Sequence, residues 1–179
     1  MTILSGKRGL IVGVANEKSA AWGIAKKASD LGAELAFTYQ IPAFEKRIAP
    51  LAESVKSDIM IPCDLSEEAS AKKAMKQLST HWSEVDFVVH AVGFSDKQEL
   101  SGAYYNTSRQ NFRQTMLISA FSFTELAQAS APMMPNGGSL LTLSYLGSVR
   151  TTPNYNVMGV AKAALEASVR YLAVDLGGR

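Results

Sequence analysis

With 179 residues, 47% hydrophobic and 19% charged, the chain has enough apolar material for a folded domain, and intrinsic disorder is excluded. Its 18 basic and 16 acidic residues give a net charge of +2, so charge gives no reason to expect nucleic acid or an anionic membrane surface as a partner. One cysteine and two histidines exclude a disulfide framework and a metal site. No apolar run approaches the ~20 residues that cross a bilayer. We therefore expect a soluble, cytoplasmic protein.

Short apolar runs alternate with helical patterns along the chain. The apolar runs predict strands at 9–14, 33–39, 59–63, 87–92 and 139–143. The helical patterns predict helices at 20–31, 44–55, 67–82, 111–131 and 155–176. Continuous apolar strands separated by helices are typical of a parallel sheet covered on both faces. We therefore predict a single α/β domain over residues 1–179, a three-layer, doubly wound Rossmann-type sheet with strand order 3-2-1-4-5 that binds NAD.

The chain ends at Leu176-Gly177-Gly178-Arg179, directly after the last predicted helix, where glycines favour a helix end. Nothing follows to supply a sixth strand, so we expect the C-terminal strands of such a fold to be missing from this chain. An open edge strand exposes backbone groups and apolar side chains. We therefore expect these residues alone not to form a stable, active unit.

The loop after the first strand departs from the G-x-G-x-x-G fingerprint of dinucleotide-binding folds but keeps a glycine at each end. Gly13 permits a tight turn, and Gly23 allows the next helix to pack against the sheet. Ser19 and Ala20 stand where that helix begins, and backbone N–H groups there can bind a pyrophosphate. A plain strand-loop-helix connection explains the same residues, so both interpretations stay open.

Gln40 follows the second strand, where an acidic residue often binds the adenosine ribose. Its amide can hydrogen-bond ribose hydroxyls, and no arginine immediately follows to bind a 2′-phosphate. NADH is therefore favoured over NADPH, although Lys46 and Arg47 keep NADPH open.

Two further segments follow strands at the sheet edge where open α/β folds bind ligands. Asp64 and Leu65 follow the third strand, and Ala91-Val92-Gly93 follows the fourth. The Asp64 carboxylate can accept a hydrogen bond from the adenine amino group, or it can equally cap a helix or close a turn. We predict that both segments bind the cofactor, as do Gly13, Ser19, Ala20 and Gln40.

The segment after the fifth strand contains Tyr145, Tyr155 and Lys162. If Tyr155 opens the last helix, Lys162 lies about two turns later, and both side chains project from one face about 10 Å apart along the axis. A phenol with a pKa near 10 is protonated at neutral pH and can donate to an oxygen that gains negative charge, and a nearby ammonium would strengthen that donation. An amphipathic surface helix has the same spacing, so this pair alone does not distinguish an active site from a surface helix.

Six motifs together carry a resemblance. They are Gly13-x5-Ser19-x-Ala21-x-Gly23, Thr38-Tyr39-Gln40, Cys63-Asp64, His90-Ala91-Val92-Gly93-Phe94, Leu141-Thr142-Leu143-Ser144-Tyr145 and Pro153-Asn154-Tyr155-Asn156-Val157-Met158-Gly159-x-Ala161-Lys162. This set resembles the bacterial type I, NADH-dependent enoyl-acyl-carrier-protein reductases, a divergent family of short-chain dehydrogenases/reductases. Ordinary members of that superfamily have Y-x3-K, but here Gly159 stands where their lysine would be.

The resemblance implies reduction of the trans-2 double bond of enoyl-acyl-carrier-protein thioesters with NADH in fatty-acid elongation. It implies that Tyr155 binds the thioester oxygen, that Lys162 holds the nicotinamide ribose, and that Tyr145 is a second active-site tyrosine of open role. Phe94, Leu100 and Met158 match positions that line the acyl pocket, although a Rossmann core would explain them equally. A homotetramer built through the helices at 111–131 and 155–176 is implied too.

Two other functions stay open at this point. A ketoreductase of the same superfamily would have Y-x3-K, which is absent at Tyr155. A catalytically inactive, nucleotide-sensing Rossmann module would need only the cofactor-binding end. Such a module would have no use for Tyr145, Tyr155 and Lys162 together, so an enoyl reductase is the prediction.

Overall fold

The computed structural model describes residues 2–178, which divide into two compact units. The sheet unit comprises the residues up to Ala91 together with Gln128–Thr142. The helical unit comprises Val92–Ala127 and the residues from Leu143 onward. The single domain expected over the whole chain stays a prediction.

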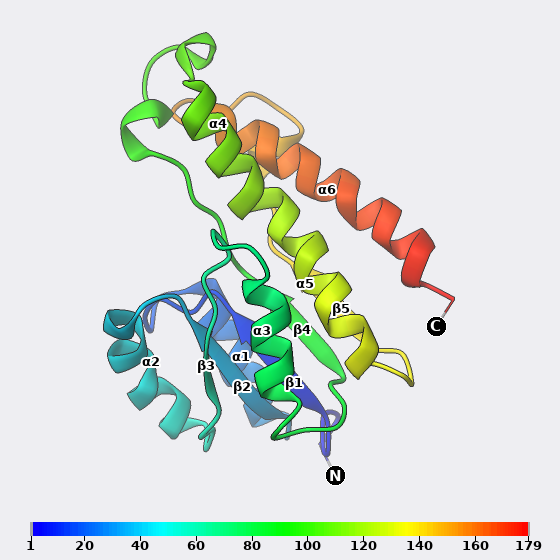
Figure 1. Cartoon of the computed structure of the whole chain (residues 1–179). Coiled ribbons are helices and arrows are strands. Elements are labelled where there is room, and N and C mark those ends of the chain that lie inside the picture. The colour runs from blue at the N-terminus through cyan, green and yellow to red at the C-terminus, as the bar shows by residue number, and fades with distance from the viewer. Residues whose placement is uncertain (1, 179) are drawn as a thin grey trace. The chain divides into compact units, whose positions relative to one another are not determined.

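The sheet unit contains five parallel strands in the predicted order, β3-β2-β1-β4-β5 (Figure 1). The strands are β1 (Arg8–Val12), β2 (Glu34–Tyr39), β3 (Met60–Pro62), β4 (Phe87–His90) and β5 (Ser139–Thr142). Gly9 of β1 pairs with Leu35 on one side and with Phe87 on the other. The middle residues of these central strands are almost fully buried, as parallel strands covered on both faces require.

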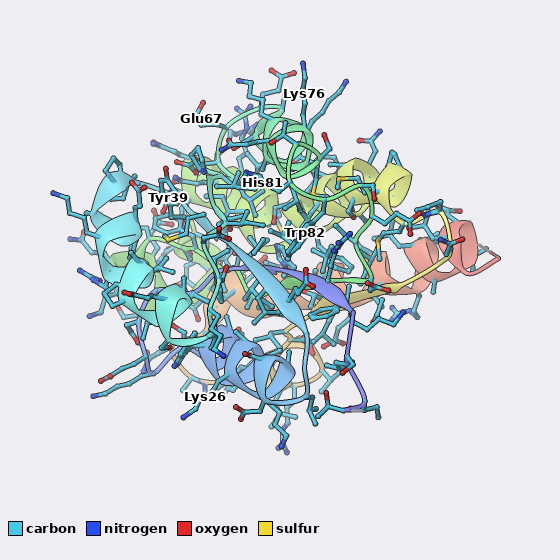
Figure 2. All side chains as sticks on the ribbon, turned by 90° about the horizontal axis from the view of Figure 1, so that it is seen from below. Lys26, Tyr39, Glu67, Lys76, His81 and Trp82 are labelled. Atoms are coloured by element: carbon cyan, nitrogen blue, oxygen red, sulfur yellow. The ribbon has the colours of Figure 1, made fainter. Side chains whose placement is uncertain are left out.

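Three helices pack on this sheet: α1 (Ala20–Asp30), α2 (Pro42–Ser54) and α3 (Ser70–Leu78). Lys26 of α1 and Lys76 of α3 point away from the sheet on its two opposite sides, so the sheet unit has the predicted three layers (Figure 2). Trp22 packs on Phe37 with ring centroids 6.3 Å apart. α3 begins later than predicted because Ala69, with φ of 61°, adopts a left-handed conformation that the helix cannot include, and it ends at Leu78.

An apolar hollow of about 960 Å³ lies beside α1 and β5 in the sheet unit. Ile24, Ala28, Val89 and Leu141 are among the residues that line it. A Cβ added to Gly23, which also lines the hollow, would meet nothing within 4 Å. The close packing that we predicted at Gly23 is therefore wrong for this chain, because that side of α1 faces open space.

The helical unit contains two long helical segments that run beside each other (Figure 1). One is α6 (Asn156–Leu176). The other consists of α4 (Arg109–Met116), a π-helical turn (Leu117–Phe121) and α5 (Ser122–Ser130), where the sequence predicts one helix over 111–131. The last residues of α5 belong to the sheet unit. The π turn contains an extra residue, and the Ser122 hydroxyl donates to the Ile118 carbonyl at 2.7 Å.

No helix within residues 2–178 is long and apolar enough to span a membrane.

Candidate active site

The loop after β1 is organised by its own side chains. Gly13 has φ of 106°, the positive value that a tight turn after the strand requires. Ser19 directly precedes α1, but its hydroxyl oxygen accepts from the backbone N–H groups of Ala15 and Asn16, at 3.0 Å each, and does not cap the helix. The start of α1 at Ala20 therefore has no serine cap, which leaves it open to an anionic group.

Gln40 and Asp64 come together at the carboxyl ends of β2 and β3. The Gln40 amide donates to Oδ2 of Asp64 at 3.1 Å, while Oδ1 accepts from the backbone N–H and the hydroxyl of Ser66 at 2.9 and 2.7 Å. Burial alone would raise the pKa of Asp64, but the hydrogen bonds from Ser66 and Gln40 outweigh it and hold the pKa below its usual value. The turn role of Asp64 is confirmed, and its adenine role stays a prediction. The neighbouring Leu65 is buried.

The chain passes from the sheet unit to the helical unit between Ala91 and Val92. The Ala91 N–H donates to the carbonyl of Val12 at 2.8 Å, which continues the pairing of β4 with β1. Inside the helical unit, a Cβ on Gly93 would lie 3.3 Å from Cε of Met158 and 3.7 Å from Nζ of Lys162. The backbone at Gly93 therefore lies beside the side chains of Met158 and Lys162.

The two predicted tyrosines are in contact. Tyr155 is the residue before α6, as the spacing predicted, and its ring centroid lies 4.8 Å from that of Tyr145 at an interplanar angle of 57°. Tyr155 is half-buried, whereas Tyr145 is 51% exposed. Burial first, and Tyr145 second, raise the pKa of the Tyr155 phenol, so it is protonated at neutral pH.

Lys162 lies on α6, and its side chain is buried, with 7% of the residue exposed. Its ammonium donates to the Leu143 carbonyl at 2.9 Å. Burial lowers the pKa of Lys162. An ammonium has three N–H donors, and within residues 2–178 this one has a single acceptor. Two donors therefore remain for the hydroxyls of a ribose, so the residues present fit the predicted cofactor.

The three predicted acyl-pocket residues lie outside the buried core. Phe94 is 46% exposed, and Leu100 and Met158 are half-buried. The Ser119 hydroxyl accepts from the Phe94 N–H and donates to the Phe94 carbonyl, at 2.9 Å each, and it lies 3.5 Å from Sδ of Met158. Ordinary core packing, the alternative explanation of these residues, is therefore wrong for Phe94.

Comparison with known proteins matches this geometry to one family. Residues 13–179 match the family model described as "Enoyl-(Acyl carrier protein) reductase". The "Enoyl-[acyl-carrier-protein] reductase [NADH] 2" of Rhizobium meliloti is 59% identical over 177 residues, which cover 99% of this chain and 66% of that protein. The chain belongs to the enoyl-(acyl carrier protein) reductase family. It spans about two thirds of the length of such relatives, 66% in this case.

Solved structures of enoyl-(acyl carrier protein) reductases have the same fold. FabI from Candidatus Liberibacter asiaticus is 55% identical with a TM-score of 0.98, and the match covers 99% of this chain and 69% of that one. The reductase from Anaplasma phagocytophilum, solved in complex with NAD, is 55% identical with a TM-score of 0.96, and the match covers 99% and 68%.

In this reductase-family chain, sequence reasoning missed the residues that hold the loops of the helical unit. The Asn156 amide donates to the carbonyls of Glu99 and Gly102 at 3.3 Å each, which ties the segment around Leu100 to the start of α6. Asn111, which is buried, accepts from the Asp96 N–H at 2.9 Å. No spacing rule in the sequence points to these amides.

Glu166 was missed too, although a signal for it was available. It lies four residues after Lys162, on the same side of α6. Its Oε1 accepts from the hydroxyls of Ser144 and Ser148, the latter at 2.5 Å.

Proposed function

We propose that the protein reduces the trans-2 double bond of enoyl thioesters carried by acyl carrier protein, with NADH as the reductant, in fatty-acid elongation. The observation that carries this proposal is the contact of Tyr145 with Tyr155 at the start of the helix that bears the buried Lys162. Family membership and the names of the relatives support it.

Tyr155 has the role of hydrogen-bond donor. When bound, NADH would supply the hydride that is added to the β-carbon; the π electrons of the double bond would move to give an enolate with negative charge on the thioester oxygen, and a proton from solvent would complete the reduction at the α-carbon. The Tyr155 phenol donates to that oxygen, and its raised pKa keeps the donor protonated. Tyr145 packs against Tyr155 and, being half exposed, is available to the substrate as a second phenol.

Different residues hold the nicotinamide half and the adenosine half of the cofactor in this proposal. The two unused donors of Lys162 bind the hydroxyls of the nicotinamide ribose, next to the backbone at Val92 and Gly93. Gln40 binds the adenosine ribose, and Asp64 binds the adenine amino group. The remaining contacts come from Gly13, Ser19, Ala20, Leu65 and Ala91.

The acyl chain contacts Phe94, Leu100 and Met158. The exposed apolar ring of Phe94 supports this role, since its backbone is held on both sides by Ser119 while its side chain is left accessible. An accessible, positioned aromatic side chain is suited to binding an apolar ligand.

The native assembly in this proposal is a cytoplasmic homotetramer. Exposed apolar side chains on α4, the π turn and α6 support association through these helices. They include Phe112, Phe121, Tyr171 and Val174. A monomer by light scattering at micromolar concentration would contradict this part of the proposal.

The test uses a protein of the length of its relatives that contains this chain, follows its NADH oxidation with crotonyl thioester, and repeats it with NADPH and with a β-ketoacyl thioester. We expect oxidation of NADH with the enoyl substrate. Oxidation with the ketoacyl substrate alone would replace the proposal with a ketoreductase. Tight NADH binding with neither reaction would favour a nucleotide sensor.

A further inference from the structure

One face of α6 and its preceding residue contact a single short segment, Leu143–Ser148. The contacts come from Tyr155, Gly159, Lys162 and Glu166, which are spaced four, three and four residues apart. This is the spacing of one helix face. The segment includes Tyr145, so the face that carries Tyr155 and Lys162 also holds the second tyrosine.

The glycines along this face have no room for a side chain. A Cβ on Gly147 would clash with the Tyr155 ring, lying 2.8 Å from its Cε1 atom. A Cβ on Gly159 would lie 2.7 Å from the Gly147 carbonyl oxygen. The segment is therefore packed closely against the start of α6.

Besides the Lys162 ammonium, which donates to the Leu143 carbonyl, Glu166 makes polar contacts with this segment from the far end of the face. Its Oε1 atom accepts from the Ser144 and Ser148 hydroxyls, which stand on either side of Tyr145 in the chain. These two hydrogen bonds, and the nearby Arg170, lower the pKa of the Glu166 carboxyl, so it is ionised at neutral pH. Hydrogen bonds to an ionised acceptor are the stronger kind.

The Tyr145 side chain makes few contacts that fix its orientation. It is 51% exposed, and in the described part of the chain its phenol makes no hydrogen bond, so the ring contact with Tyr155 is its main restraint. The orientation of its ring therefore depends on the backbone on either side.

We propose that Glu166 is a positioning residue, whose carboxylate binds Ser144 and Ser148 and thereby holds Tyr145 against Tyr155. The proposal rests on the proposed function for its effect on turnover, but the contact itself is independent of that function. Glu166 does not touch the substrate or the cofactor in this proposal.

The contact is tested by amide hydrogen exchange on the full chain. The backbone N–H groups of Ser148, Val149 and Arg150 donate to the carbonyls of Tyr145 and Leu146 at 2.9 to 3.3 Å, so they report on the order of the segment. We expect Glu166→Ala to speed their exchange about five- to tenfold, because it removes the acceptor of both the Ser144 and the Ser148 hydroxyl. Glu166→Gln, which keeps an acceptor oxygen, should restore most of the protection. Unchanged exchange at these amides would overturn the proposal.

The effect on catalysis is tested by a double-mutant cycle with Tyr145→Phe. We expect Glu166→Ala to lower kcat about tenfold and to leave the Kd for NADH unchanged, since the cofactor contacts do not include Glu166. In the Tyr145→Phe background the same substitution should change kcat less than twofold, because Glu166 acts through that phenol. An equal loss of kcat in both backgrounds would overturn the proposal.

Asp175→Ala is the matched control, because Asp175 is an exposed carboxylate on the same helix. It should leave both exchange and kcat unchanged. If the wild-type protein does not oxidise NADH with crotonyl thioester, the proposed function fails, and the exchange of the three amides still decides whether Glu166 holds the segment.

Discussion

The two units hold their polar groups in different ways. In the sheet unit, Gln40 and Asp64 follow β2 and β3, so the register of two paired strands brings them together. In the helical unit, Tyr155, Lys162 and Glu166 share one helix face. Side-chain hydrogen bonds join Lys162 and Glu166 to a loop, and a ring contact joins Tyr155 to it. Backbone pairing of the strands thus sets the positions of Gln40 and Asp64, whereas the positions of the active-site candidates on α6 and its loop depend on contacts of individual side chains. We therefore expect single substitutions to reduce turnover or NADH affinity more in the helical unit than in the sheet unit.

The largest effect is expected from Tyr155→Phe. Loss of the phenol removes the donor to the charged oxygen, so kcat should fall by about 10²- to 10³-fold. The Kd for NADH, measured by fluorescence, should stay unchanged. Tyr105→Phe removes a phenol from an exposed position of the helical unit and serves as the control. Unchanged turnover in Tyr155→Phe would rule out the proposed role.

Lys162→Met should mainly weaken cofactor binding. Loss of the ammonium removes donors to the ribose, so the Kd for NADH should rise about 10- to 100-fold. Burial lowers the pKa of Lys162, so in the wild type the affinity should fall as the pH rises through that lowered value, because the neutral amine is the weaker donor. In Lys162→Met this alkaline loss should disappear. Lys72→Met, at an exposed position of α3, should change neither the Kd for NADH nor its pH dependence.

Asp64→Asn should have a smaller effect in the sheet unit, raising the Kd for NADH about fivefold. Because hydrogen bonds hold the pKa of Asp64 below its usual value, wild-type affinity should persist at mildly acidic pH and be lost only as the pH falls through that lowered pKa. Glu67→Gln, an exposed acid a few residues later, is the control (Figure 2). Equal effects of the two substitutions would argue against a specific role for Asp64.

The smallest effect is expected from Gly23→Ala, which should stabilise the protein by about 0.5–1 kcal/mol because alanine favours a helix and nothing opposes its Cβ. Thermal unfolding measures the change. Gly9→Ala should instead destabilise the protein, because its Cβ would clash with the Phe87 ring. A loss of stability in Gly23→Ala would show that the helix surface at Gly23 is covered.

The positions of the strands followed from local patterns, whereas the roles of the active-site candidates rested on the resemblance to a known family. Apolar runs marked all five strands, including β5, whose residues are not buried. The Tyr155-to-Lys162 spacing predicted side chains on one face, which fits their contacts with the segment Leu143–Ser148. The start of α3 was missed because Ala69 adopts a conformation that alanine seldom shows. The Asn156 contacts were missed because they join residues far apart in the sequence, which no helix or strand period reports. Helical spacing from Lys162 placed Glu166 on the same face, but it did not point to the serine partners of Glu166.

The π turn at Leu117–Phe121 also sets the rotational phase of α5, the helix directly after it. One extra residue rotates every later position of a helix by about 100°. Buried Phe123, Leu126 and Ala127 lie just beyond the turn and face the interior only in this phase. Deleting one residue between 117 and 121 would restore a regular helix and turn polar positions inward. The turn therefore allows one continuous helical segment to present two differently aligned apolar faces along its length.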